Sequence, residues 1–148
     1  MPRRPLTANR QTGEPISIRL SRATDQLVAA EARRTRRSKS AVVSAFTEET
    51  ARMRRFPGIG FRGVDAARRA WVIGSGLDAW EISQMVEDFG TIELLLAETH
   101  ISERQARLAL AYRDAYPTEI ADAIADNRLP TDELRVLYPL IEVAADRG

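Results

Sequence analysis

The sequence predicts a mainly α-helical protein built from two modules. The first has one strand and two helices and needs a second copy, and the second is small and all-helical. Three observations predict this fold: an isolated alternating segment near the N-terminus, a series of capped helical segments, and a division of charge. Residues 1–62 hold 14 Arg or Lys against 5 Asp or Glu, whereas residues 63–148 hold 8 against 16. Such asymmetry suggests a basic module that meets nucleic acid and a separate acidic module.

Composition changes along the chain predict the module boundaries. Residues 1–14 have two prolines, three arginines and no periodicity, so we expect a disordered basic arm. The first module then covers residues 15–55. The glycine- and proline-rich stretch 56–64 is interpreted as a linker. Residues 65–148 form the acidic helical module.

The segment 16–20 alternates in the manner of a strand. Its odd positions, Ser17 and Arg19, are polar, and its even positions are apolar. No second strand is predicted nearby, and a lone strand leaves its backbone groups unpaired. We therefore expect antiparallel pairing with the same segment of a second copy, which makes the dimer obligate. The predicted dimer core consists of Ile16, Ile18, Leu20, Val42 and Phe46.

Two capped helices follow this strand. Ser21 is suited to cap a helix over residues 22–35, whose apolar stripe is Leu27, Val28, Ala29 and Ala32. After a basic turn, Ser38 is suited to cap a second helix that ends near Arg55, before Pro57. A strand and two short helices cannot build an adequate core alone. This is a second reason to expect a dimer.

The chemistry of the first module suits double-stranded DNA. A two-stranded ribbon fits the major groove, where Arg19 can donate two hydrogen bonds to guanine and Ser17 can contact several bases. The start of the second helix offers free amides and a positive dipole end, which together favour phosphate. The predicted phosphate-binding residues are Arg37, Ser38, Lys39 and Ser40.

Residues 15–55 resemble the ribbon-helix-helix family of DNA-binding proteins, the MetJ, Arc and CopG fold. The resemblance lies in the strand "PISIRLS" and in "SKSAVVSAF", which opens the second helix at the family spacing. It implies a homodimer, or a higher even oligomer, that binds a pseudo-palindromic operator. By position, it implies that Ser17 and Arg19 read bases and that residues 38–40 hold the DNA backbone.

The second module is predicted to be helical after a short extended segment, "AWVIGSG". Caps at Asp78, Thr91 and Ser102 begin successive helices, Pro117 ends the third of these, and Pro139 should kink the last helix. The helices 91–98 and 102–115 resemble a helix-turn-helix. Because this half has a net charge of −8, we favour a packing unit or a protein-binding surface over a DNA reader.

Residues 57–128 resemble a bacterial family known only as domain of unknown function four-thirty-three. The segment "ALAYRDAYPTEI" carries most of this resemblance. That family is small and helix-turn-helix-like, and it occurs in antitoxins paired with PIN-domain ribonuclease toxins. The resemblance implies a toxin-facing or regulatory role and identifies no functional residue.

We find no sequence pattern typical of an enzyme, a metal site or a cofactor site. The chain has no cysteine and one histidine, His100, which lies in a predicted turn. No apolar run approaches the length of a membrane span, so we expect a cytoplasmic protein. The sequence thus predicts a transcriptional repressor that acts as the antitoxin of a type II toxin-antitoxin pair. A stand-alone dimeric regulator and an assembly adaptor that does not bind DNA are the alternatives.

Overall fold

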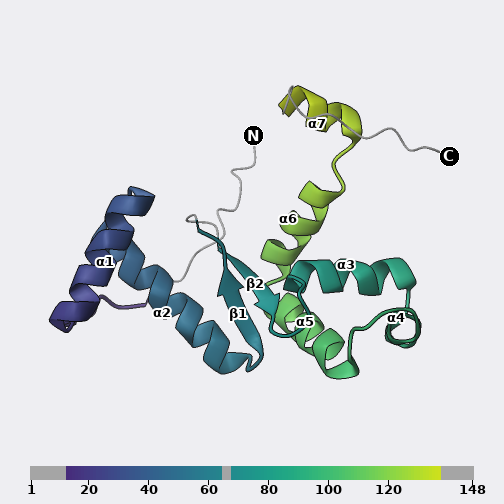
Figure 1. The fold of residues 1–148 in the computed structure, drawn as a ribbon, viewed down its shortest axis with the longest axis horizontal. Helices are drawn as coiled ribbons and strands as arrows, with labels where there is room; N and C mark the ends of the chain where they lie inside the picture. The colour runs from purple at the N-terminus through teal and green to yellow at the C-terminus, as the bar shows by residue number, and fades with distance from the viewer. Residues whose placement is uncertain (1–12, 65–67, 138–148) are drawn as a thin grey trace, which may run out of the picture. The chain divides into compact units, whose positions relative to one another are not determined.

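The computed structural model describes residues 13–64 and 68–137, which are mainly helical and include a small two-stranded antiparallel sheet (Figure 1). Internal contacts divide the chain into two units, residues 1–42 and 43–148. This division falls inside helix α2 (Lys39–Arg55), whereas the sequence predicts a boundary after that helix. The predicted basic arm, apart from its last two residues, and the predicted kink at Pro139 lie outside the described residues.

In the first unit, an extended segment leads into α1 (Arg22–Thr35) and the start of α2. The predicted Ser21 cap is present: its side chain accepts a hydrogen bond from the Thr24 amide at 3.3 Å. The Ser38 hydroxyl likewise accepts from the Ala41 amide at 3.1 Å. Arg36 ends α1 in a left-handed conformation (φ 54°), a turn that usually favours glycine.

The apolar interior of the first unit is small. Val28 and Ala32 of α1 and Val42 of α2 are buried. Leu27, predicted to share their stripe, is 62% exposed in the single chain. The described part of this unit has no assigned strand, because residues 16–20 have no backbone partner within it.

The second unit begins with the end of α2 and a β-hairpin, which corrects two predictions. Strands β1 (Ile59–Arg62) and β2 (Arg69–Val72) pair antiparallel, with Ile59 opposite Val72. The module is therefore not all-helical, and residues 56–64 are not a linker. The glycines that suggested a linker have a packing role instead: a Cβ on Gly60 would lie 2.7 Å from Trp71 Nε1. The expected extended segment near residue 70 is confirmed as β2.

Helices complete the second unit, and their starts agree with the predicted caps. A capping box joins Asp78 to Glu81, another joins Ser102 to Gln105, and the Thr91 hydroxyl accepts from the Leu94 amide at 3.2 Å. Pro117, predicted to end the helix before it, is itself the first residue of the next helix, a position where proline is favoured. The helices are α3 (Ala79–Phe89), α4 (Ile92–Glu98), α5 (Glu103–Ala115), α6 (Pro117–Asn127) and α7 (Thr131–Leu137).

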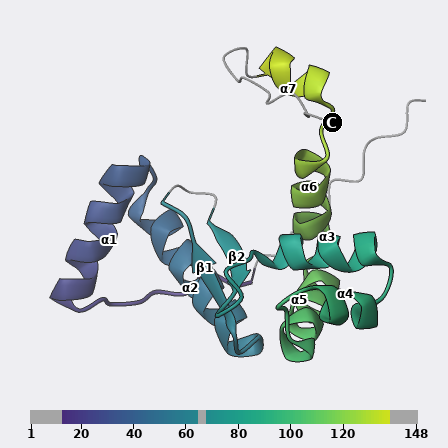
Figure 2. The same cartoon turned by 45° about the vertical axis from the view of Figure 1, so that its right-hand side comes forward.

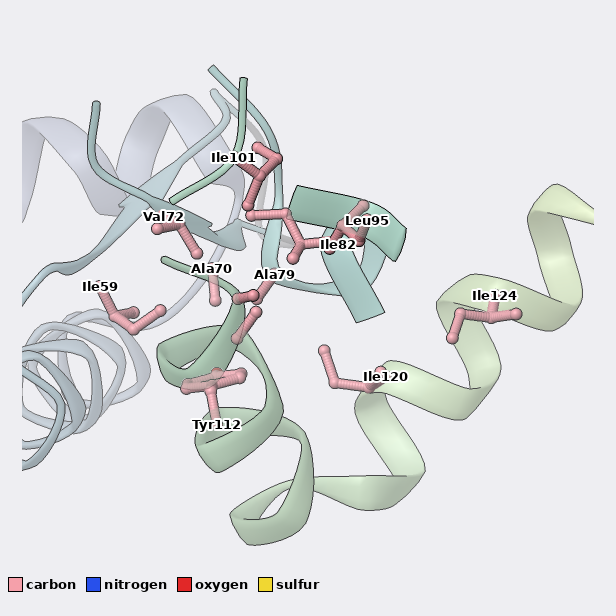
Figure 3. Packing of buried hydrophobic residues seen from close by; sticks show 12 residues of the cluster. Ile59, Ala70, Val72, Ala79, Ile82, Leu95, Ile101, Tyr112, Ile120 and Ile124 are labelled. Carbon is pink, nitrogen blue, oxygen red and sulfur yellow. The ribbon is translucent and has the colours of Figure 1, made fainter. Parts of the chain in front are cut away.

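A single hydrophobic cluster lies between the hairpin and helices α3 to α6 (Figure 3). Helix α3 lies against α5 in both overall views (Figures 1 and 2) and also contacts α4 and α6. Within the described ranges, no helix has both the length and the apolar character required to cross a bilayer. The labelled core residues are Ile59, Ala70, Val72, Ala79, Ile82, Leu95, Ile101, Tyr112, Ile120 and Ile124.

Candidate nucleic-acid interface

The predicted base-reading residues lie on an extended segment that is open on both faces in the single chain. Ser17 and Arg19 are exposed. Ile16 and Ile18 are also exposed, at 83% and 55%, while Leu20 is partly buried. Two β-branched apolar side chains this exposed leave an uncovered apolar edge beside the polar positions.

The predicted phosphate-binding residues meet at the start of α2. Ser38 and Ser40 are exposed, and the Ser38 hydroxyl serves as the helix cap. Arg37 is partly buried, and its guanidinium donates to the Ala41 carbonyl at 3.5 Å. Lys39, the first residue of α2, forms an ion pair with Asp25 in the first turn of α1. No local sequence pattern predicts this pair, because it joins residues 14 positions apart.

The described residues of the first unit carry an excess of positive charge. Both acidic residues of α1 are paired with a cation: Asp25 with Lys39, and Glu31 with Arg34. Their charges are thus locally balanced, and the surplus comes from other cations. Within residues 13–42, the exposed arginines outside these pairs are Arg19, Arg22, Arg33 and Arg36.

The other predicted dimer-core residues differ in burial. Val42 is 1% exposed, so it is already covered within one chain. Phe46 is partly buried in the second unit. Only the isoleucines of the extended segment are left largely uncovered, and they are the part of the predicted dimer core that a partner copy can still bury.

A polar cluster that the sequence did not predict lies in the second unit. The Arg52 guanidinium donates to the Tyr112 hydroxyl at 2.8 Å and to Glu119 at 2.7 Å, and the hydroxyl donates to Glu119 at 3.2 Å. The guanidinium carbon also lies 3.9 Å from the centre of the Tyr116 ring. Burial raises the pKa of Tyr112 well above that of a free tyrosine. The phenol therefore stays protonated, and the cluster joins α2, α5 and α6.

A second polar cluster holds the hairpin against α3. The buried carboxylate of Asp78 accepts from Arg62 at 2.7 Å, from Arg69 at 2.9 Å and from the Trp80 indole at 3.3 Å. Arg62 and Arg69 lie directly opposite each other across the two strands. Asp78 balances two like charges that would otherwise repel. We assign this cluster a structural role.

The two helices predicted at 91–98 and 102–115 are present as α4 and α5, which contact each other. Helix α5 carries Arg104, Arg107 and Arg113. Two of them have acidic neighbours: Arg107 binds Glu103 at 2.7 Å, and Arg113 binds Asp114 at 3.0 Å. These pairs reduce the positive charge that α5 can offer to phosphate.

The lone histidine and the acidic residues form no metal site in the part of the chain described. His100 lies in the turn between α4 and α5, with Nε2 at 3.3 Å from the Ser75 carbonyl. Among residues 13–64 and 68–137, no three His, Cys, Asp or Glu side chains come together to hold a metal ion.

No protein-family model, curated protein or solved structure matches this chain. The two family resemblances noted in the sequence therefore stay predictions.

Proposed function

We propose that this chain is a dimeric, sequence-specific DNA-binding repressor that acts as the antitoxin of a type II toxin-antitoxin pair. One observation carries the DNA-binding part: exposed Ile16 and Ile18 alternate with exposed Ser17 and Arg19 on an extended segment that has no backbone partner among residues 13–64 and 68–137. Burying each isoleucine fully would contribute about 1.5–3 kcal/mol. A second copy can provide this burial.

In the proposed dimer, residues 16–20 of two chains pair antiparallel. This ribbon satisfies both backbones and places the isoleucines against the helices. Ser17 and Arg19 then project from both strands on the opposite face. A ribbon of this width enters the major groove, where the Arg19 guanidinium recognises the two acceptors of guanine.

The start of α2 supplies the sequence-independent contacts in this proposal. Its free amides and the side chains of residues 37–40 lie at one helix end, and phosphate is the ligand that such an end favours. Such contacts fix the register of the ribbon on DNA, and the base contacts select the sequence. A two-fold dimer implies a pseudo-palindromic operator.

We assign the second unit to a protein partner. Its sequence is acidic, and α5 holds Arg107 and Arg113 next to carboxylates, so phosphate is a poor ligand for it. The resemblance of residues 57–128 to an antitoxin-associated family indicates the class of partner, a PIN-domain-like ribonuclease. Holding that partner while the first unit binds DNA would couple toxin neutralisation to repression.

Fluorescence anisotropy on the chain's own upstream DNA, against a scrambled duplex and over a salt series, tests the DNA-binding proposal. We expect tight, salt-sensitive binding that prefers the native fragment. Arg19→Ala should lose about 1–3 kcal/mol per half-site on that fragment and much less on scrambled DNA. Arg104→Ala, which removes an exposed arginine from α5, is the matched control and should change neither affinity. Equal, feeble binding to both duplexes would contradict the proposal and favour an assembly adaptor.

Co-expression with the neighbouring gene products tests the antitoxin role separately. We expect a stable complex in which the chain suppresses the ribonuclease activity of its partner. DNA binding without any such complex would contradict the antitoxin role and indicate a stand-alone regulator.

A further inference from the structure

The side chain of Lys39, which we propose binds phosphate, already has a partner in the structure. Its ammonium group forms an ion pair with the carboxylate of Asp25, and the two side chains are 52% and 49% exposed. Pairs this exposed are weak and open readily. A ligand that binds Lys39 must displace this carboxylate.

The position of Asp25 differs from that of the other acidic residue on the same helix. Glu31 binds Arg34 one turn away, within α1. Asp25 instead binds Lys39, the first residue of α2, at the helix end that we propose contacts the DNA backbone. The Asp25 carboxylate therefore lies against a residue that we propose binds phosphate.

We propose that Asp25 is an internal competitor for DNA phosphate: its carboxylate holds Lys39 in the free protein and gives way to a phosphate on binding. The inference rests on the proposed DNA-binding function. A carboxylate and a phosphate seek the same ammonium group, and Asp25, once displaced, is left close to the negative backbone. Phosphate contacts carry no sequence information. Asp25 therefore weakens binding to every duplex by a similar factor, which limits non-specific binding.

The substitution Asp25→Asn in the full chain tests this inference on the native and scrambled duplexes. We expect binding to tighten about two- to thirty-fold on both, because two weak, exposed pairs per dimer no longer have to open. Arg19→Ala, in contrast, acts mainly on the native duplex. Glu31→Gln is the matched control, since it removes the same charge from the same helix. Its partner Arg34 is not one of the proposed phosphate-binding residues. This substitution should tighten binding much less.

Combination with Lys39→Met shows whether the effect passes through Lys39. In that background, Asp25→Asn should have little effect, because there is no ammonium group to release. Three results would each overturn the inference. One is an equal gain in DNA affinity from Asp25→Asn and Glu31→Gln, and another is a gain from Asp25→Asn that persists in the Lys39→Met background. The third is weaker DNA binding by Asp25→Asn than by the wild-type chain. All affinities are compared at a temperature where circular dichroism shows every variant folded. If the wild-type chain binds no duplex, the proposed function itself fails, which is a distinct result.

Discussion

The Arg52 guanidinium of α2 donates a hydrogen bond of 2.8 Å to the Tyr112 hydroxyl of α5, 60 residues later in the chain. Glu119 of α6 accepts from both groups. Because these contacts tie the second half of α2 to the helices of the second unit, the chain divides within α2 and not at Pro57. A single helix thus begins in one unit and ends in the other.

Removing the Tyr112 hydroxyl should destabilise the second unit. Tyr112→Phe keeps the buried ring but removes two hydrogen bonds to charged groups, so we expect a loss of about 2 kcal/mol in the free energy of unfolding. Urea denaturation measures this loss. Tyr116→Phe is the matched control, because it keeps the ring under Arg52 and should cost much less. Equal stability of Tyr112→Phe and wild type would contradict the role given to the cluster.

The same hydroxyl predicts a dependence of stability on alkaline pH. Burial raises the pKa of Tyr112 in the folded state, whereas the unfolded chain ionises near the ordinary tyrosine value of about 10. Below that pH both states are protonated and the stabilisation is fully present. Above it, ionisation favours the unfolded state by up to about 1.4 kcal/mol per pH unit. The stability gap between wild type and Tyr112→Phe should therefore shrink above pH 10, and urea titrations from pH 8 to 11 would show it. A gap that widens would refute this account.

Asp78→Ala should destabilise the hairpin and the start of α3 together. It removes the carboxylate that balances Arg62 and Arg69 and also removes a helix cap, so we expect a loss of about 3 kcal/mol or more. Asp88→Ala, which removes an exposed carboxylate paired with Arg128, is the control and should lose under about 1 kcal/mol. Thermal unfolding compares the two variants. Similar losses would argue against a special role for Asp78.

Ile18→Asp should prevent dimerisation. In the proposed ribbon this side chain is buried, and an unpaired carboxylate there is strongly unfavourable. Light scattering coupled to size exclusion would then report a monomer or an unfolded chain. Val136→Asp, at a site 81% exposed on α7, provides the control and should leave the oligomeric state unchanged. A soluble Ile18→Asp dimer would show that the ribbon is not the interface.

Much of the helical architecture could be predicted because helix starts are local. The caps at Ser21, Asp78, Thr91 and Ser102 each depend on a residue and an amide two or three positions later. Such signals are fully contained in a short window of sequence. The structure confirms all four.

The hairpin and the candidate site show what a short window misses. The sequence predicts that Gly58 and Gly60 lie in a linker. In the structure they are packed so closely that a Cβ at either position would lie within 2.8 Å of another side chain. The Asp25–Lys39 pair depends on how α1 and the start of α2 approach each other, which no local pattern specifies. The sequence predicts that Ser17 and Arg19 face away from the dimer core and that Ile16 and Ile18 are part of it. In one chain, all four side chains are exposed.

The sequence by itself determined where helices begin, which residues alternate on the extended segment, and how charge is divided between the halves. Those properties follow from local hydrogen bonding, side-chain periodicity and composition. Only the tertiary structure decided that residues 59–62 form a strand, that Arg52, Tyr112 and Glu119 share one cluster, and that Lys39 is held by Asp25. These outcomes require residues far apart in the chain to meet, and the packing of the whole unit selects which of them do.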